Sequence, residues 1–176
     1  VLVSFIWVFI FTNAMPALGG VLGWDWLANI SWFGTPSMAT VTIIVVSIWQ
    51  NIGFLMIIYT AGLQTIPKDV MESAELDGCS GLKKVLKIEL PLLMPTVTIN
   101  LFVSISGAFK SFDIPNAMTG GGPYGSTMPV AMNIYQEAFT KYNLGYGSAK
   151  SVILFLTVAA VTLIQLYCTR KKEVEY

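Results

Sequence analysis

Long apolar runs alternate with short polar segments along this chain. Charged residues are absent from Trp26 to Pro67 and from Leu90 to Phe109, and they crowd the stretch between, from Lys68 to Glu89. A helix needs roughly 20 mainly apolar residues to cross the hydrocarbon core of a bilayer. The pattern therefore predicts four membrane spans, at about residues 1–18, 38–63, 92–112 and 149–169.

The composition supports an all-α polytopic membrane protein. Hydrophobic residues make up 55% of the chain and charged residues 11%, a balance typical of integral membrane proteins. His is absent and the formal net charge is zero, so nothing predicts nucleic-acid binding or a histidine proton relay. Cys79 and Cys168 fall at the predicted inner face, where thiols stay reduced. We expect no disulfide, metal site, cofactor or catalytic residue.

The basic residues predict which loops are cytoplasmic. Seven lie in the central polar segment or after the last span and three lie elsewhere: Lys68, Lys83, Lys84, Lys87, Arg170, Lys171 and Lys172 against Lys110, Lys141 and Lys150. Because Lys and Arg are enriched in cytoplasmic loops, we expect the loop at about 66–91 and the C-terminus to be cytoplasmic. The segment at about 113–148 is then an outer loop, in which the spacing from Val130 to Phe139 predicts a short helix.

The cytoplasmic loop has the pattern of two short helices joined by a turn. The apolar face of the first helix holds Val70, Met71 and Ala74, and that of the second holds Leu82, Val85 and Leu86. Asp77-Gly78 favours a tight turn because Gly accepts positive φ, and Ser80 is a candidate N-cap for the second helix. Such a unit is suited either to docking an apolar knob into a partner or to resting on lipid headgroups.

The loop also resembles a known family. Inner-membrane permease subunits of binding-protein-dependent ABC importers carry a cytoplasmic loop that reads Glu-Ala-Ala, three residues, Gly, nine residues, then Ile-x-Leu-Pro. The residues that match at this spacing are Glu72, Ala74, Gly78, Ile88, Leu90 and Pro91. Ser73, Cys79 and Val85 depart from the usual residues. A fixed-distance match of this length, between two predicted spans, is far more specific than most short motifs.

Further segments resemble the carbohydrate branch of that family, whose members include permeases for maltose, other oligosaccharides and glycerol 3-phosphate. They are Gly53-Phe54, Ala61–Gln64, Ile66-Pro67, Met118–Pro123, Ala138-Phe139 and Gly145–Ala149. The resemblance implies a type I importer permease with about six helices, of which this chain would hold the C-terminal four with the coupling-helix loop. It also implies a bacterial or archaeal plasma membrane.

The resemblance implies partners as well. These are a cytoplasmic dimer of ATP-binding subunits that grips the loop, a second permease subunit, and an extracytoplasmic solute-binding protein. The chain has no Gly-x-x-x-x-Gly-Lys-Ser/Thr phosphate loop, so we expect ATP hydrolysis on a partner and no enzymatic activity here.

Candidate site residues follow from the same resemblance and from side-chain chemistry. For contact with the ATPase they are Glu72, Ala74, Asp77, Gly78, Leu82 and Val85, and for the loop-to-helix junction Ile88, Leu90 and Pro91. Candidates for the solute path are Gln50, Asn51, Asn100 and Ser104, because amides and hydroxyls bind sugars. Candidates for docking the solute-binding protein are Gly120, Gly121, Gly122 and Pro123.

Each assignment has an alternative. The polar residues inside the spans are also suited to hydrogen bonds between helices, and the glycine-rich segment to a plain surface turn. The whole chain could instead be a membrane scaffold or assembly protein. An ion-coupled secondary transporter is disfavoured because the predicted span centres hold no Asp, Glu, Lys, Arg or His.

Overall fold

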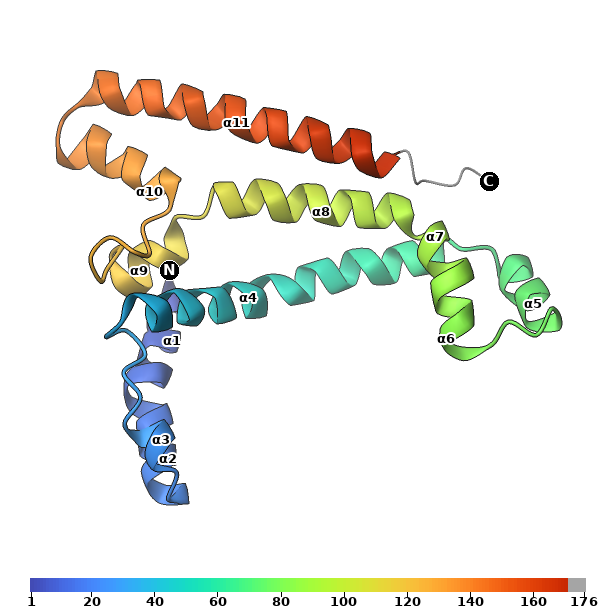
Figure 1. Cartoon of the computed structure of the whole chain (residues 1–176), viewed down its shortest axis with the longest axis horizontal. Coiled ribbons are helices and arrows are strands. Elements are labelled where there is room, and N and C mark those ends of the chain that lie inside the picture. The colour runs from blue at the N-terminus through green and yellow to red at the C-terminus, as the bar shows by residue number, and fades with distance from the viewer. Residues whose placement is uncertain (171–176) are drawn as a thin grey trace. The chain divides into compact units, whose positions relative to one another are not determined.

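The computed structural model describes residues 1–170 and contains helices but no strand within that range (Figure 1). The basic residues Lys171 and Lys172, which contribute to the predicted orientation, lie outside the described residues. The helices, three of them single π turns labelled η, are α1 (Leu2–Phe9), η1 (Ile10–Ala14), α2 (Met15–Leu22), α3 (Asp25–Ala28), α4 (Pro36–Gln64), α5 (Lys68–Leu76), α6 (Gly81–Lys84), η2 (Val85–Glu89), α7 (Leu90–Leu92), α8 (Met94–Phe109), α9 (Asp113–Thr119), α10 (Val130–Tyr135), η3 (Gln136–Thr140) and α11 (Leu144–Arg170).

Three helical stretches within the described residues are long and apolar enough to cross a membrane: Leu2–Leu22, Pro36–Gln64 and Leu144–Arg170. A fourth is possible if the bent pair Gly81–Leu92 and Met94–Phe109 counts as one span. Large apolar side chains such as Phe5, Ile57 and Phe155 are exposed along them. Lipid or further helices must cover this surface, because an apolar surface of this size is unfavourable in water.

The first of these stretches extends past Leu18, where the sequence suggests an end. Pro16 lies within this continuous helix, directly after the π turn η1, and the helix runs on to Leu22. Gly23, with φ of +68°, ends the helix. The last stretch likewise begins at Leu144, ahead of the expected start near residue 149.

The chain divides into two compact units, one of Val1–Gln50 with Phe109–Leu154 and one of Asn51–Ala108 with the segment from Phe155 onward. The core of the first unit is formed by Phe11, Val46 and Met118. The Phe11 ring lies 4.9 Å from that of Trp32 and 5.4 Å from that of Trp7, measured between centroids. Aromatic packing thus joins α1, η1 and the segment before α4, and Val46 and Met118 bring α4 and α9 to the same core.

Close backbone contacts in the first unit depend on small residues. A Cβ on Gly19 would lie 2.5 Å from the backbone nitrogen of Ala28, so α2 and α3 can touch only because Gly19 has no side chain. A Cβ on Gly147 would lie 2.7 Å from that of Ala138. The start of α11 packs against η3 for the same reason.

In the second unit, α8 bonds to both neighbours in space, α4 and α11 (Figure 1). The Asn100 amide nitrogen donates to the Leu55 carbonyl at 3.4 Å, and the Gln165 amide nitrogen donates to the Thr98 carbonyl at 3.3 Å. A Cβ on Gly62 would overlap the side chain of Thr96. Small residues and interhelical hydrogen bonds therefore hold these helices together, as is usual within membranes.

We predict that Gly19→Ala destabilises the protein while the neighbouring Gly20→Ala does not. The Gly19 Cβ would meet backbone, which cannot rotate away, so the expected loss of unfolding free energy is about 1–3 kcal/mol. A Cβ added to Gly20 would have no atom within 4 Å, and alanine there improves helix propensity. Thermal melting in detergent would check this, and equal melting temperatures would contradict the close approach of α2 and α3.

Candidate coupling loop and solute path

The loop begins with a tight turn at the end of α4. The Thr65 nitrogen donates to the Gly62 carbonyl at 3.1 Å and the Ile66 nitrogen to the Leu63 carbonyl at 3.3 Å. Pro67 is extended and precedes α5, whose first turn carries Asp69 near the positive end of the helix dipole. The side chain of Ile66 is buried, which anchors the start of α5.

A left-handed glycine ends α5. Gly78 has φ of +73°, its nitrogen donates to the Glu75 carbonyl at 3.0 Å, and the Cys79 nitrogen donates to the Ala74 carbonyl at 2.9 Å. These two bonds define a Schellman motif, which satisfies carbonyls that would otherwise be free at the helix end. The turn predicted at Asp77-Gly78 is present, and Ala74 is buried while Glu72 is exposed.

The second helix of the loop runs from Gly81 to Leu92 through α6, η2 and α7. Ser80 occupies its N-cap position in extended conformation, although its side chain makes no capping hydrogen bond. The predicted apolar face is open: Leu82 is 74% exposed, Leu86 55% and Val85 42%. Apolar side chains this exposed on a polar loop indicate a surface that another molecule covers.

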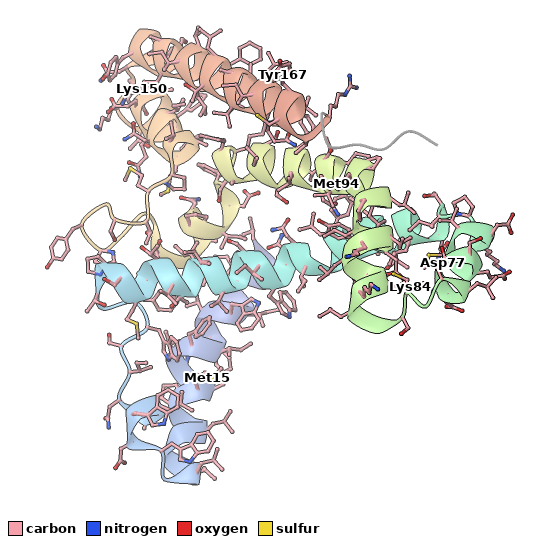
Figure 2. All side chains as sticks on the ribbon, turned by 45° about the vertical axis from the view of Figure 1, so that its right-hand side comes forward. Met15, Asp77, Lys84, Met94, Lys150 and Tyr167 are labelled. Atoms are coloured by element: carbon pink, nitrogen blue, oxygen red, sulfur yellow. The ribbon has the colours of Figure 1, made fainter. Side chains whose placement is uncertain are left out.

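An ion pair joins the two loop helices; its lysine, Lys84, is labelled in Figure 2. The Lys84 ammonium donates to the Glu75 carboxylate at 2.7 Å. This hydrogen bond, with the attraction between the two charges, lowers the pKa of Glu75. The carboxylate therefore keeps its charge to lower pH than an isolated Glu, and the pair is lost only as the pH falls through that lowered pKa. The sequence pattern does not predict this pairing.

The junction with α8 is sharply bent. The sequence predicts that Leu90-Pro91 and Pro95 lead into the third span, and the structure places Pro91 in the loop helix, with a bend of 70° between Leu92 and Met94. Pro95 explains the bend because it lacks the N–H that would bond to Pro91, and its ring crowds the preceding turn. Ile88, Leu90 and Pro91 thus belong to the loop helix, and Pro95 falls in the first turn of α8.

The four candidates for the solute path fall into two groups. Gln50 and Asn51 are exposed neighbours on α4, and Ser104 is exposed on α8. Asn100 is only 3% exposed and donates to Leu55. Its bond to α4 matches the interhelical alternative, and its carbonyl oxygen is buried without a partner among the described residues.

The glycine-rich segment is an ordered loop that follows α9. Gly120 and Gly121 have φ of +60° and +88°, and a cis peptide bond joins Gly122 to Pro123. The Thr127 hydroxyl donates to the Gly122 carbonyl and shares a hydrogen bond with Thr119, both at 2.7 Å. Tyr124, next to Pro123, is 98% exposed.

The first unit also holds a charged cluster, formed where α10 and η3 meet α11, that the sequence pattern predicts only in part. The Glu137 carboxylate accepts from Lys141 at 2.8 Å, which is the main reason its pKa is lowered, and Lys150 lies 3.5 Å away. The Lys150 ammonium also donates to Asn133 at 2.7 Å and sits 4.4 Å from the centre of the Tyr146 ring. The i,i+4 spacings of Glu137 with Lys141 and of Tyr146 with Lys150 are signals for two of these contacts. The other two, from Lys150 to Glu137 and to Asn133, depend on how α10 and η3 meet α11.

The loop geometry and the matched residues agree with a single family. The chain belongs to the family described as binding-protein-dependent transport system inner membrane component, which matches residues 1–174. This agrees with the resemblance carried by the loop residues Glu72 to Pro91.

Individual relatives are similar along most of the chain. The "Probable starch degradation products transport system permease protein AmyD" of Thermoanaerobacterium thermosulfurigenes is 36% identical over 99% of this chain and 59% of its own length. The "Sulfoquinovosyl glycerol transport system permease protein SmoG" of Agrobacterium fabrum is 39% identical over 82% of this chain and 47% of its own length. The chain thus spans about half to three-fifths of these relatives.

A solved structure has the same fold. It is the crystal structure of a bacterial ABC transporter involved in the import of the acidic polysaccharide alginate, and it matches with a TM-score of 0.84 at 19% identity. The match covers 97% of this chain and 60% of the other. The type I permease fold expected from the sequence is therefore confirmed.

We predict that Lys84→Gln loosens the turn between the loop helices. Loss of the Glu75–Lys84 pair removes the side-chain link between α5 and α6, so amides from Asp77 to Leu82 should exchange faster in hydrogen–deuterium exchange. Lys68→Gln is the matched control, because Lys68 makes no ion pair within residues 1–170. Equal exchange in the two variants would contradict a stabilising role for the pair.

Proposed function

We propose that this chain is part of the permease subunit of an ATP-driven importer and forms part of the path for a sugar or a sugar-phosphate-like solute. Its relatives include permease proteins named for starch degradation products, sulfoquinovosyl glycerol and sn-glycerol 3-phosphate. The observation that carries the proposal is the loop between α4 and α8, a helix–turn–helix with family residues at fixed spacing and an exposed apolar face.

The loop is the contact for a separate ATPase. Leu82 and Val85 supply the apolar knob, and the exposed Glu72 supplies a charge on the neighbouring helix. Gly78 and Asp77 fix the angle between the two helices, and buried Ala74 lets α5 pack closely. The loop is cytoplasmic in this proposal, as its lysines predict.

Movement of the loop reaches the membrane through both helices that flank it. Closure of the ATPase dimer shifts the loop as a rigid body. The contacts of Gly62 with Thr96 and of Asn100 with Leu55 tie α4 to α8, so the two helices move together. Gln50, Asn51 and Ser104 then remain as candidates for the solute path, and Asn100 serves the pairing of the helices.

The partner set completes the proposal. A second permease subunit covers part of the exposed apolar surface, and a solute-binding protein docks on the outer side at Gly120–Pro123, where Tyr124 projects. The assembly lies in a bacterial or archaeal plasma membrane with the C-terminus inside.

We predict that Gly78→Val in the full-length protein abolishes co-purification with the ATPase subunits and solute-stimulated ATP turnover in proteoliposomes. A side chain at positive φ costs about 1–2 kcal/mol, which favours a different turn and misplaces the knob. Gly23→Val is a close control, because Gly23 also ends a helix, has φ of +68° and would have no atom within 4 Å of an added Cβ.

Capture that is lost in Gly78→Val and kept in Gly23→Val supports the importer. No capture by the wild type would return the chain to the scaffold alternative. Unchanged coupling in Gly78→Val would remove the turn from the mechanism.

We further predict that Asn51→Ala and Asn100→Ala behave differently. Asn51→Ala should raise the KM for solute uptake several-fold, as expected for a residue on the path. Asn100→Ala should lower the melting temperature, because the buried amide links α8 to α4; the expected loss is about 1 kcal/mol. Uptake and thermal melting of the same preparations would separate these roles, and normal uptake in Asn51→Ala would remove it from the path.

A further inference from the structure

The second helix of the loop, Gly81–Leu92, exposes more apolar and basic surface than the proposed ATPase knob at Leu82 and Val85 accounts for. Leu82, Leu86 and Leu90 follow one another at intervals of four and are 74%, 55% and 43% exposed. Lys83 and Lys87 have the same spacing, are exposed, and form no ion pair within residues 1–170. Lys84, by contrast, is bound to Glu75.

The π turn Val85–Glu89 brings the three leucines, and likewise the two lysines, closer to a straight line along the helix. In an α-helix four residues make slightly more than one turn, so residues four apart drift around the axis. A π turn holds more residues per turn and reduces this drift. The three leucines therefore form one line, with Lys83 and Lys87 beside it.

The direction of the helix fits a membrane surface. It makes an angle of 70° with α8. Spanning helices are tilted only about 20° from the bilayer normal on average. A helix at 70° to such a spanning helix lies nearer to the membrane plane than to the bilayer normal. Its C-terminal half, with Leu86 and Leu90, is next to α8, whereas the turn at Gly78 and the tip at Leu82 are farther along the loop.

We propose that this helix binds the cytoplasmic leaflet, with Leu86 and Leu90 in the interface and Lys83 and Lys87 paired to anionic phospholipid headgroups. An apolar stripe bordered by lysines is the pattern of interfacial helices, and anionic lipids attract basic residues near that leaflet. The lipid thereby sets the height and angle at which the loop meets its partner. The binding itself does not depend on the proposed ATPase contact.

The test uses the full-length protein in nanodiscs, without ATPase, on a background of Cys79→Ser and Cys168→Ser. A nitroxide on Leu86→Cys reports collision with oxygen, which concentrates in lipid, and with a water-soluble nickel chelate. We expect a lipid-like ratio when phosphatidylglycerol is present. Each lysine near an anionic surface contributes about a fivefold preference for it, so Lys83→Gln with Lys87→Gln should lower partition of the helix roughly 25-fold. The control, Lys68→Gln with Lys110→Gln, removes the same charge elsewhere and should leave the ratio unchanged.

The remaining conditions of the experiment test whether something other than lipid covers the helix. Inorganic phosphate added to phosphatidylcholine nanodiscs should not restore the lipid-like ratio; if it does, the lysines bind free phosphate and the lipid proposal is wrong. A water-like ratio in anionic nanodiscs also overturns it, and so does shielding that appears only when ATPase subunits are added. Capture of the ATPase is measured separately with Gly78→Val, so failure of lipid binding and failure of the importer proposal give different results.

Discussion

The constraint on which this structure depends is that a peptide group inside hydrocarbon must find its hydrogen-bond partner within the protein. Helices satisfy this rule locally, which is why α4 and α11 run for 29 and 27 residues while the short helices and turns gather in the polar segments. Where a helix ends, other groups of the protein can form hydrogen bonds with its free backbone groups. The Schellman bonds after α5 and the threonine bonds around Gly122 are two such places.

Under this constraint the helices associate mainly through close contacts at small residues, and less through the burial of apolar side chains. Lipid tails are as apolar as leucine, so burying leucine gives little advantage within the bilayer. Gly19 against Ala28, Gly62 against Thr96 and Gly147 against Ala138 bring backbones or short side chains together instead. Asn100 and Gln165 add hydrogen bonds between helices in the second unit. The loop is fastened to this framework at both ends, at Ile66 and at Leu93, which are both buried.

Many of the elements could be predicted from the sequence because apolar length, glycine turns and charge distribution are local signals. The loop helices, the turn at Gly78 and the helix at Val130 could all be predicted in this way. The bend at Leu93 was missed because Pro91 and Pro95 both qualify as helix starts, and only the three-dimensional path shows which one interrupts the helix. The Glu75–Lys84 pair and the bond from Lys150 to Asn133 were missed because their partners are nine or more residues apart and meet through tertiary packing.

The helix lengths have a consequence for the surrounding bilayer. At 1.5 Å per residue, the 16 residues of α8 span about 24 Å, and the 29 residues of α4 about 44 Å. A hydrocarbon core is about 30 Å thick, so α8 is too short for it and α4 too long. A helix longer than the core fits by tilting or by projecting from it, as α4 can. A helix as short as α8 crosses by itself only where the bilayer thins, so the segment Gly81–Leu92 before the bend supplies the length that α8 lacks.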